Sequence, residues 1–322
     1  MSVLVALIQS PSLLGEVSKN VARLEAQCRK AATQGAKILV LPETSITGYL
    51  SENLRQNWHL PERPIDPSFE PKLLTKEFAE PSNGPSVQHF LRLGQELSVY
   101  ITVPFLEYDE SGHFYNSVSL VGPAHAGNGV LAHYRKNCPW PFPEKSWATP
   151  GDGVEQAIFD TEYGRVGLAI CFDIHTILAK YYQKGLWALL YPIAWVGDTG
   201  TWFGETLPQR LKTYRCPFHI LGANWATRCP ESWQGAGNST VYGPNGAIIA
   251  QAQVTPAWKE DIIYAELPTA PPTIAGTDSH TAPLPDPFDL QGYVEKWSGG
   301  QINADYWTAG PGVALCRPAE QP

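Results

Sequence analysis

The sequence lacks the marks of a nucleic-acid-binding protein or a membrane protein. Its 322 residues carry a formal net charge of −8, and no block of lysines and arginines stands out, whereas nucleic-acid binders usually present a basic patch. The longest apolar stretch, 186–196, is much shorter than a membrane span and contains Pro192. The first residues have no basic segment of the kind that begins a signal peptide. We therefore expect a cytoplasmic protein with no nucleic-acid partner and no membrane association.

Metal-site and nucleotide-site motifs are missing as well. The six cysteines lie far apart, with no C-x-x-C pair and no cysteine–histidine cluster at the spacing of zinc ligands. The segment after the first apolar run, Gln-Ser-Pro-Ser at 9–12, is neither a G-x-G-x-x-G turn nor a P-loop. A papain-like segment of the Cys-Gly-Ser-Cys-Trp type is also absent. In a reducing compartment we expect the cysteines to be free thiols, most of them packed as small apolar groups.

Apolar runs and helical periodicities alternate along the chain. Strands are predicted at 3–8, 37–41, 99–106, 115–121, 129–134, 157–159, 166–170, 186–191, 219–223, 241–243, 248–250 and 262–267. Helices are predicted at 16–34, 85–97, 174–184 and 201–214. Interleaved strands and helices indicate an α/β fold, and the hairpin-like pairs indicate mixed sheets. We expect one domain over 1–267 and an extended C-terminal arm over 268–322, packed on the body or on a partner subunit.

Three residues with complementary chemistry follow predicted strands. Cys171 ends an apolar run, Glu43 follows Leu-Pro, and Lys136 follows Tyr-Arg. Ligand sites of open α/β sheets lie at the carboxyl ends of the strands. A thiolate is a nucleophile, a carboxylate can move protons, and an ammonium can hold an oxyanion together with the Phe172 backbone N–H. Each residue alone also has a structural interpretation, as a packed thiol, a solvated acid or a surface charge. Together they suggest amide hydrolysis through a thioester intermediate.

These segments resemble the Glu, Lys and Cys blocks of the carbon–nitrogen hydrolase (nitrilase) superfamily, on its amidase side. The blocks are Leu-Val-Leu-Pro-Glu at 39–43, Tyr-Arg-Lys at 134–136 and Gly-Leu-Ala-Ile-Cys-Phe-Asp at 167–173. The similarity runs from about residue 3 to residue 267. The resemblance implies a nitrilase-like α/β fold, a four-layer α-β-β-α sandwich. It also implies no metal or organic cofactor, and a homodimer or a higher homo-oligomer built from dimers.

The same resemblance implies roles for individual residues. Cys171 would attack the carbonyl carbon, while Lys136 and the Phe172 N–H hold the oxyanion. Glu43 would protonate the departing amine and then activate water against the thioester. Glu144 lies in a segment similar to the one that supplies a second glutamate in amidases. Its implied role is to hold Lys136 and orient the substrate, so the expected catalytic residues are Glu43, Lys136, Cys171 and Glu144.

Five residues near these blocks are predicted to bind the substrate: Tyr49, Phe172, Trp147, Trp195 and His175. Tyr49 belongs to a Thr-Gly-Tyr segment after the Glu block. Trp140, Trp147 and Trp195 flank the Lys and Cys blocks, where they can form an apolar wall. His175 comes four residues after the cysteine, so a Cys–His pair is one alternative and a place in the following helix is the other.

The predicted activity is hydrolysis of a non-peptide amide bond of a small molecule, with release of an amine or ammonia and a carboxylic acid. The residues after Cys171 read Phe-Asp-Ile-His-Thr-Ile-Leu at 172–178, whereas many relatives have Asp-x-Arg-Phe-Pro-Glu there, so a carbamoyl substrate is less favoured. Cys-Phe-Asp-Ile resembles the biotinidase and pantetheinase branch. N-carbamoyl amidohydrolase and nitrilase activities stay alternatives on the same scaffold, and a non-catalytic binding protein of this fold is the alternative of another class.

Overall fold

Two six-stranded β-sheets form the centre of the protein. The computed structural model describes residues 1–13, 15–49, 77–140, 144, 147–195, 199–226, 237–253 and 259–270. The strands of the first sheet are β1 (Ser2–Gln9), β2 (Ile38–Val40), β3 (Tyr100–Tyr108), β4 (Phe114–Val121), β5 (Ala132–Arg135) and β12 (Asp261–Pro268). The strands of the second sheet are β6 (Ile158–Thr161), β7 (Gly164–Leu168), β8 (Ala188–Ile193), β9 (His219–Asn224), β10 (Thr240–Tyr242) and β11 (Ile248–Gln251).

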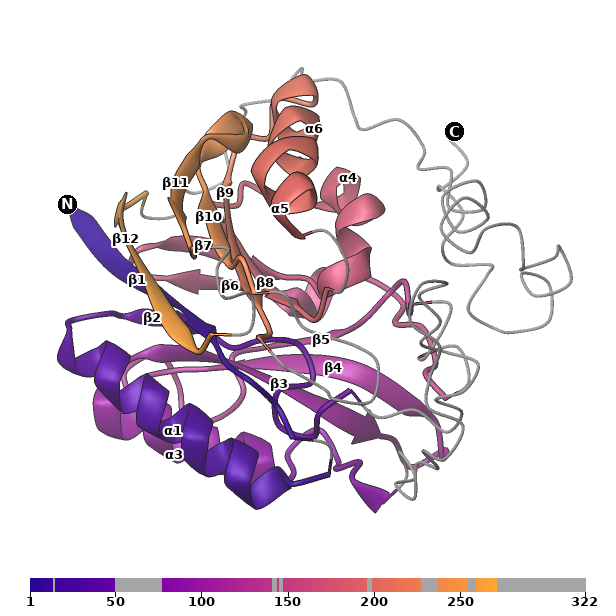
Figure 1. Ribbon diagram of the computed structural model, residues 1–322. Helices are drawn as coiled ribbons and strands as arrows, with labels where there is room; N and C mark the ends of the chain where they lie inside the picture. The colour runs from indigo at the N-terminus through magenta and orange to yellow at the C-terminus, as the bar shows by residue number, and fades with distance from the viewer. Residues whose placement is uncertain are drawn as a thin grey trace, which may run out of the picture.

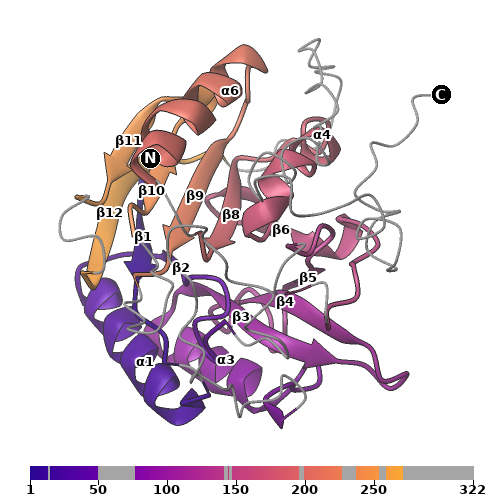
Figure 2. The same ribbon diagram turned by 45° about the vertical axis from the view of Figure 1, so that its right-hand side comes forward.

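The two sheets have matching strand orders, β12-β1-β2-β3-β4-β5 and β11-β10-β9-β8-β7-β6. Parallel pairs lie in the middle of each sheet, β1-β2-β3 in the first and β7-β8-β9 in the second, and the outer pairs are antiparallel. Both sheets are therefore mixed, as the sequence predicted. The sheets stack with β11 beside β12 at one end, which the two views of the ribbon also show (Figures 1 and 2).

Helices cover the outer faces of both sheets. Helices α1 (Val17–Thr33) and α3 (Pro85–Leu97) lie against the first sheet. The helices α4 (Leu178–Tyr181), α5 (Thr199–Thr201) and α6 (Leu207–Thr213) lie on the second. A helix layer, two sheets and a second helix layer follow one another through the molecule (Figure 1). The four-layer α-β-β-α sandwich expected from the sequence is thus confirmed.

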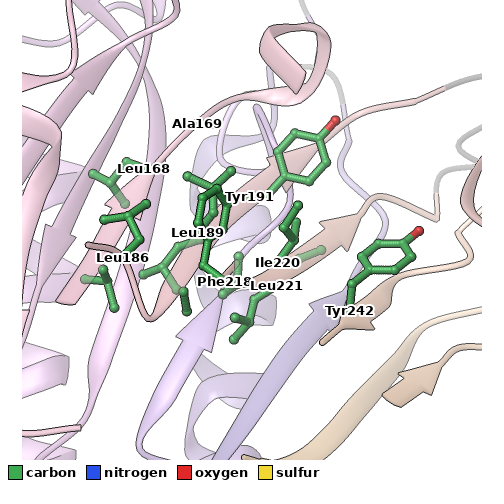
Figure 3. Close-up of a cluster of buried hydrophobic side chains, with 14 of the residues drawn as sticks. Leu168, Ala169, Leu186, Leu189, Tyr191, Phe218, Ile220, Leu221 and Tyr242 are labelled. Carbon is green, nitrogen blue, oxygen red and sulfur yellow. The ribbon is translucent and has the colours of Figure 1, made fainter. Parts of the chain in front are cut away.

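Strand alternation divides the side chains of the first sheet between two apolar layers. In β1, Val5 and Leu7 belong to the cluster between the sheets, while Ala6 and Ile8 belong to the cluster under the helices. Both sides of this strand are buried, which is why its sequence reads as a continuous apolar run. Figure 3 shows the second sheet's contribution, in which side chains of neighbouring strands lie side by side; those labelled include Leu189, Tyr191, Ile220, Leu221 and Tyr242.

The segment after β7 differs from the helix predicted at 174–184. A 3₁₀ turn occupies Cys171–His175, and only Leu178–Tyr181 is α-helical. The carboxylate of Asp173 accepts the backbone N–H of Ile170 at 3.2 Å, which closes the turn tightly on the end of the strand. The residue that begins this turn is therefore presented on a tight bend rather than on a helix.

The helix predicted at 201–214 is also more irregular than expected. It begins with Thr199–Thr201, widens into a π turn over Trp202–Thr206 and continues as Leu207–Thr213. Pro208 explains the wide turn, because proline has no N–H to close an α-helical hydrogen bond to the residue four positions earlier. The other predicted strands and helices agree with the structure to within about three residues at each end. The predicted arm lies outside the described residues from residue 271 onward.

Candidate active site

The ends of β2 and β5 bring Glu43 and Lys136 into contact. The backbone N–H of Glu43 donates to the carbonyl oxygen of Ile193 in β8 at 3.3 Å, and that of Lys136 donates to Asn116 in β4 at 2.8 Å. The Lys136 Nζ donates to Glu43 Oε1 at 2.7 Å, and neither side chain has exposed surface. A fully buried ion pair therefore joins two chain segments that the sequence separates by 93 residues.

Glu144 supplies a second carboxylate to the same ammonium. Lys136 Nζ donates to Glu144 Oε2 at 2.7 Å. Three further donors reach this carboxylate: Asn116 Nδ2, the backbone N–H of Trp140 and the hydroxyl of Tyr49. With four donors around it, Glu144 is held in place, and it in turn holds Lys136.

Glu43 is surrounded differently from Glu144. Its Oε1 atom accepts from Lys136 and from Asn116 Nδ2, the latter at 2.8 Å. Its Oε2 atom has no hydrogen-bond partner among the residues that the structure describes. The thiol of Cys171 lies close enough to this carboxylate for the two groups to shift each other's pKa. Glu43 is thus anchored on one side and open to proton exchange with a thiol on the other.

Cys171 lies on a strained turn. Its φ of 44° is in the left-handed region, which costs a non-glycine residue on the order of 1–3 kcal/mol and is often found at functional sites. The Tyr191 hydroxyl donates to the Cys171 carbonyl oxygen at 2.5 Å, and the Ala194 backbone lies near the thiol, where it opposes the rise in the thiol's pKa. The side chain is only 7% exposed. Contacts from β8 therefore hold the bend that points the thiol at Glu43.

The charges of the site set the protonation of its groups. Burial raises the pKa of the Cys171 thiol well above its usual value, and the neighbouring Glu43 raises it further. Burial also raises the pKa of Glu43, an effect that Lys136 opposes and Glu144 reinforces. Burial disfavours charge on Lys136, but the two glutamates outweigh it and raise the pKa of the ammonium. Burial thus favours the neutral thiol, and deprotonation of the thiol needs a proton acceptor beside it, for which Glu43 is the candidate.

Asp173 lies beneath the turn and links it to the segment of Lys136. Its carboxylate accepts from the Tyr134 hydroxyl at 2.8 Å and from the backbone N–H of Cys138 at 2.7 Å. Burial raises the pKa of Asp173 to about 7, with Lys136 and the hydrogen bonds opposing the rise. One side chain thereby couples the position of the thiol to that of the ammonium.

Three residues predicted to bind substrate pack together with Trp140, which was expected in an apolar wall, and with Trp202, which had no predicted role. The ring of Phe172 lies 4.6 Å from that of Trp140 and 4.9 Å from that of His175. His175 is in turn 5.9 Å from Trp195 and 5.0 Å from Trp202, and these two indoles stack at 4.6 Å. We call these five residues the aromatic cluster. Phe172 adjoins Cys171 in sequence, so the cluster begins next to the candidate nucleophile.

His175 is bound by an arginine that the sequence did not indicate. Arg210 of α6 donates through Nη1 to His175 Nδ1 at 2.9 Å and through Nη2 to its carbonyl oxygen at 3.0 Å. Since guanidinium only donates, Nδ1 accepts and the neutral ring carries its proton on Nε2. Burial, and then Arg210, lower the pKa of His175 well below its usual value. His175 is thus occupied by Arg210, and the thiol interacts with Glu43, which favours the carboxylate over this imidazole as the partner of Cys171.

Tyr49 and Trp147 both lie at the Glu144 side of the site. Tyr49 is buried, with its hydroxyl at Glu144 and its ring 6.0 Å from that of Trp225. Trp147 donates its backbone N–H to the Glu144 carbonyl oxygen at 3.0 Å. Asn116, which bridges the two glutamates, had no predicted role. A polar amide within an apolar strand is the sequence signal that could have identified it.

The cysteines agree only in part with the sequence analysis. Cys28, Cys171 and Cys216 are free thiols, but Cys138 is disulfide-bonded, so the expectation of free thiols is wrong for Cys138. Distance along the chain did not reveal this bond, because folding brings distant segments together. Within the described ranges, no group of three or more histidine, cysteine, aspartate or glutamate residues is arranged to hold a metal ion. The same residues contain no helix long and apolar enough to cross a membrane.

Comparison with known sequences places this site in context. The family model described as carbon–nitrogen hydrolase matches residues 4–271. Omega-amidase NIT2 from Homo sapiens is 32% identical over 260 residues, which cover 78% of this chain and 83% of the relative. Omega-amidase NIT2 from Mus musculus is 29% identical over 260 residues, with the same coverage.

Solved structures resemble the chain over most of its length. Nit3 from Saccharomyces cerevisiae, a member of branch 10 of the nitrilase superfamily, matches with a TM-score of 0.65 and 23% identity, covering 83% of this chain and 90% of that one. The NitN amidase from Neterenkonia sp. AN1 matches with a TM-score of 0.67 and 18% identity, covering 83% of this chain and 93% of that one. At these identities the likeness shows a common fold, the layered sandwich described above.

Proposed function

The chain belongs to the carbon–nitrogen hydrolase family and is an amidase-type enzyme, and we propose that it hydrolyses small-molecule amides through a thioester on Cys171. The observation that carries this proposal is the buried arrangement in which Lys136 joins Glu43 to Glu144 and the Cys171 thiol lies beside Glu43. Support comes from a mutant of the amidase from Nesterenkonia sp. AN1, in which the acetamide moiety of fluoroacetamide is covalently added at the active-site cysteine.

Acylation begins with proton transfer inside the thiol–carboxylate pair. Because the pKa of the thiol is raised, Glu43 takes the proton as the sulfur attacks the carbonyl carbon of the amide. The oxygen of the tetrahedral intermediate becomes negative and is held by the Lys136 ammonium and the Phe172 backbone N–H. Glu43 then donates its proton to the leaving nitrogen, the C–N bond breaks, and a thioester remains on Cys171.

Deacylation uses the same groups in the reverse order. A water molecule gives a proton to Glu43 as its oxygen attacks the thioester carbonyl. The second tetrahedral intermediate is held by the same two donors, and its collapse breaks the C–S bond. The sulfur recovers the proton from Glu43, and the carboxylic acid leaves. The raised pKa of Glu43 suits both directions of transfer, since a carboxyl group that holds its proton weakly could not return it.

Glu144 and Asn116 have positioning roles in this scheme. Glu144 receives four donors and fixes Lys136 at a place from which its ammonium reaches both Glu43 and the oxyanion. Asn116 bridges the two carboxylates, which keeps two negative side chains together around one positive one. Removing such a bridge misplaces Glu43 without removing any reacting atom.

The test combines product release with intact-mass analysis. Primary amides, N-carbamoyl compounds, secondary amides including pantetheine, and nitriles are each incubated with the protein. The expected result is release of ammonia from primary amides and an acyl adduct on Cys171. Cys171→Ala should abolish both, while Cys216→Ala, which removes another buried free thiol, should preserve them.

Each other outcome assigns a different function. Carbon dioxide released together with ammonia would indicate an N-carbamoyl amidohydrolase, and turnover of nitriles would indicate a nitrilase. Pantothenate from pantetheine would place the substrate among secondary amides. Hydrolysis that survives in Cys171→Ala would overturn the thioester mechanism. No adduct and no product from any compound would favour a non-catalytic binding protein.

We further propose a cytoplasmic protein that assembles as a homodimer or a larger homo-oligomer, with a domain over 1–267 and an arm over 268–322. The family resemblance supports the assembly, and the composition supports the location. Sedimentation of the full chain measures its mass directly. A monomer at micromolar concentration would contradict the proposed assembly, and a chain ending after residue 270 would show whether the arm contributes to it.

A further inference from the structure

We propose that two residues at the end of β9, Asn224 and Trp225, are positioning residues for the reaction of the candidate site. They hold the segment 193–195, which ends β8 and aligns Cys171 with Glu43. We call this pair of residues the clasp. The inference rests on the proposed function, because the alignment matters only if the thiol and the carboxylate exchange a proton.

The end of β8 contacts both reacting residues. The Tyr191 hydroxyl donates to the Cys171 carbonyl oxygen at 2.5 Å. The backbone N–H of Glu43 donates to the carbonyl oxygen of Ile193 at 3.3 Å, and the backbone of Ala194 lies near the Cys171 thiol. This short stretch of chain therefore sets where the thiol stands relative to the carboxylate.

The clasp binds the backbone on both sides of Ala194. The backbone N–H of Trp195 donates to Asn224 Oδ1 at 2.9 Å, and the carbonyl oxygen of Trp195 accepts from Trp225 Nε1 at 2.9 Å. The backbone N–H of Trp225 donates to the carbonyl oxygen of Ile193 at 3.2 Å. Ala194 is thus placed by hydrogen bonds to the residue before it and to the residue after it.

The clasp is itself anchored inside the protein, where both of its side chains are 0% exposed. Asn224 Nδ2 donates to the Gly237 carbonyl oxygen at 2.6 Å, and the Asn224 backbone N–H donates to Ser239 Oγ at 2.9 Å. The Ser239 hydroxyl donates to Gln9 Oε1 of β1 at 3.0 Å. A path of buried hydrogen bonds, which rigidifies the structure around it, leads from the first sheet to the segment beside the thiol.

The amide of Asn224 suits this position because it accepts and donates at once. Its Oδ1 accepts from the backbone N–H groups of Trp195 and Trp225, the latter at 3.1 Å, while its Nδ2 donates to Gly237. Alanine can make none of these bonds. Asn224→Ala therefore leaves the Trp195 N–H without its acceptor and allows Ala194 to move relative to the thiol.

The test reads the surroundings of the thiol directly, through the rate at which iodoacetamide alkylates Cys171 over a range of pH. The Ala194 backbone opposes the rise in the pKa of the thiol. The Glu43 side chain keeps its bonds to Lys136, so Ala194 should move more than the carboxylate does. Asn224→Ala should therefore move the midpoint of the pH profile upward by about half a unit to one unit. Peptide mass analysis assigns the alkylation to Cys171.

Turnover should change through kcat rather than KM. For the primary amide that the protein hydrolyses fastest, Asn224→Ala should lower kcat by about 10- to 100-fold, the range expected when a reacting group is misplaced. KM should change by less than about 2-fold, because alignment rather than binding is affected. Trp225→Phe loses only the Nε1 donor and keeps a ring beside Tyr49, so kcat should fall by about 3- to 10-fold.

Tyr242→Phe is the control for a lost buried hydrogen bond in the same sheet. The Tyr242 hydroxyl donates to the Phe203 carbonyl oxygen at 2.7 Å, and the side chain lies in the apolar layer of the second sheet (Figure 3). The variant should lower the melting temperature but leave the alkylation midpoint and kcat unchanged. An equal shift of the midpoint in Tyr242→Phe would reveal a general effect of lower stability and overturn the clasp.

Alkylation separates this inference from the proposed function, because it needs no hydrolysis. A raised midpoint in Asn224→Ala and Trp225→Phe, in a protein that hydrolyses no amide, would support the clasp and overturn the proposed activity. An unchanged midpoint and an unchanged kcat in folded Trp225→Phe would overturn the clasp and leave the thioester mechanism standing. If Asn224→Ala does not fold, Trp225→Phe decides alone.

Discussion

The strands β4 and β5 carry two ionic clusters on opposite faces of one sheet, one fully buried and one partly exposed. The site cluster consists of Glu43, Lys136 and Glu144, and Asn116 of β4 bridges it. The outer cluster consists of Glu107, His133 and Arg135: the Arg135 Nη2 donates to Glu107 at 2.6 Å, and His133 Nε2 lies 2.9 Å from the same carboxylate. Ser117 donates to Glu107 at 2.6 Å. Neighbouring residues in sequence thus serve different clusters, because successive side chains of a strand point to opposite faces.

The two clusters differ in their balance of charge. In the outer cluster one carboxylate has a guanidinium, an imidazole and a hydroxyl, and although burial opposes it, these partners lower the pKa of Glu107 to about 2. In the site cluster two carboxylates share one ammonium, and the pKa of Glu43 is raised. Burial differs as well, because no side chain of the site cluster is exposed, whereas Arg135 of the outer cluster is 32% exposed. The ratio of acids to partners and the depth of burial together separate an acid that stabilises the fold from one suited to move a proton.

The largest expected effect is on turnover when the proposed base is neutralised. Glu43→Gln should lower kcat by about 10²–10⁴-fold, since it removes general acid–base catalysis. The melting temperature should stay the same or rise, because Glu144 still pairs with Lys136 and a carboxyl group with a raised pKa opposes folding when ionised. Steady-state ammonia release and thermal unfolding measure the two quantities. A large fall in melting temperature would show that Glu43, like Glu107, stabilises the fold.

The matching change in the outer cluster should have the opposite result. Glu107→Gln leaves Arg135 and His133 without their carboxylate and should lower the free energy of unfolding by about 1.5–3 kcal/mol, the value of hydrogen bonds to charged groups. We expect kcat/KM to change by less than about 2-fold, because the outer face is turned away from Cys171. Urea unfolding and the same activity assay test this. Loss of activity in a Glu107→Gln variant that remains folded would contradict the view that the outer cluster contributes to stability and the site cluster to catalysis.

The pH dependence of stability should also come from the outer cluster. The pKa of Glu107 is lowered from 4.5 to about 2, so its stabilisation is fully present above pH 4.5 and is lost as the pH falls toward 2. The free-energy difference between the native protein and Glu107→Gln should accordingly shrink over that interval. Urea unfolding at a series of pH values measures it. A difference independent of pH would mean that Glu107 is not ionised in the fold.

The smallest effect is expected from the hydroxyl of the outer cluster. Ser117→Ala removes one of several donors to Glu107 and should cost about 1 kcal/mol of unfolding free energy. The remaining cation partners still neutralise the carboxylate, so turnover should be unaffected. Urea unfolding of both variants tests this, because Ser117→Ala should lower the free energy of unfolding by less than Glu107→Gln does. An equal loss of unfolding free energy would mean that removing one hydroxyl removes the stabilising effect of the whole outer cluster.

Much of the site was predictable from residues at the ends of strands. Glu43 and Lys136 follow β2 and β5, and Cys171 follows β7, as expected from apolar runs that end in polar or reactive side chains. The family resemblance added Glu144. These predictions depend on local order along the chain and on a pattern of blocks, both of which the sequence contains in full.

Contacts between distant segments could not be predicted in the same way. Arg210 reaches His175 across 35 residues through the packing of α6 on the turn, and no periodicity marks either residue. The predicted helix after Cys171 was wrong because the Asp173 side chain and contacts from β8 impose a tight turn on residues with helical propensity. The outer cluster was missed because Glu107, His133 and Arg135 look like ordinary surface charges when read along their strands.

The sequence by itself determined which chemical groups are present, the order of strands and helices, and the strand ends at which Glu43, Lys136 and Cys171 occur. Those features follow from apolar periodicity and residue type, which act locally. Only the tertiary structure decided which acid has a raised pKa and which a lowered one, because a pKa depends on burial and on the charges that the two sheets bring together. The pairing of two glutamates with one lysine, and the aromatic cluster, exist only after the layers have packed.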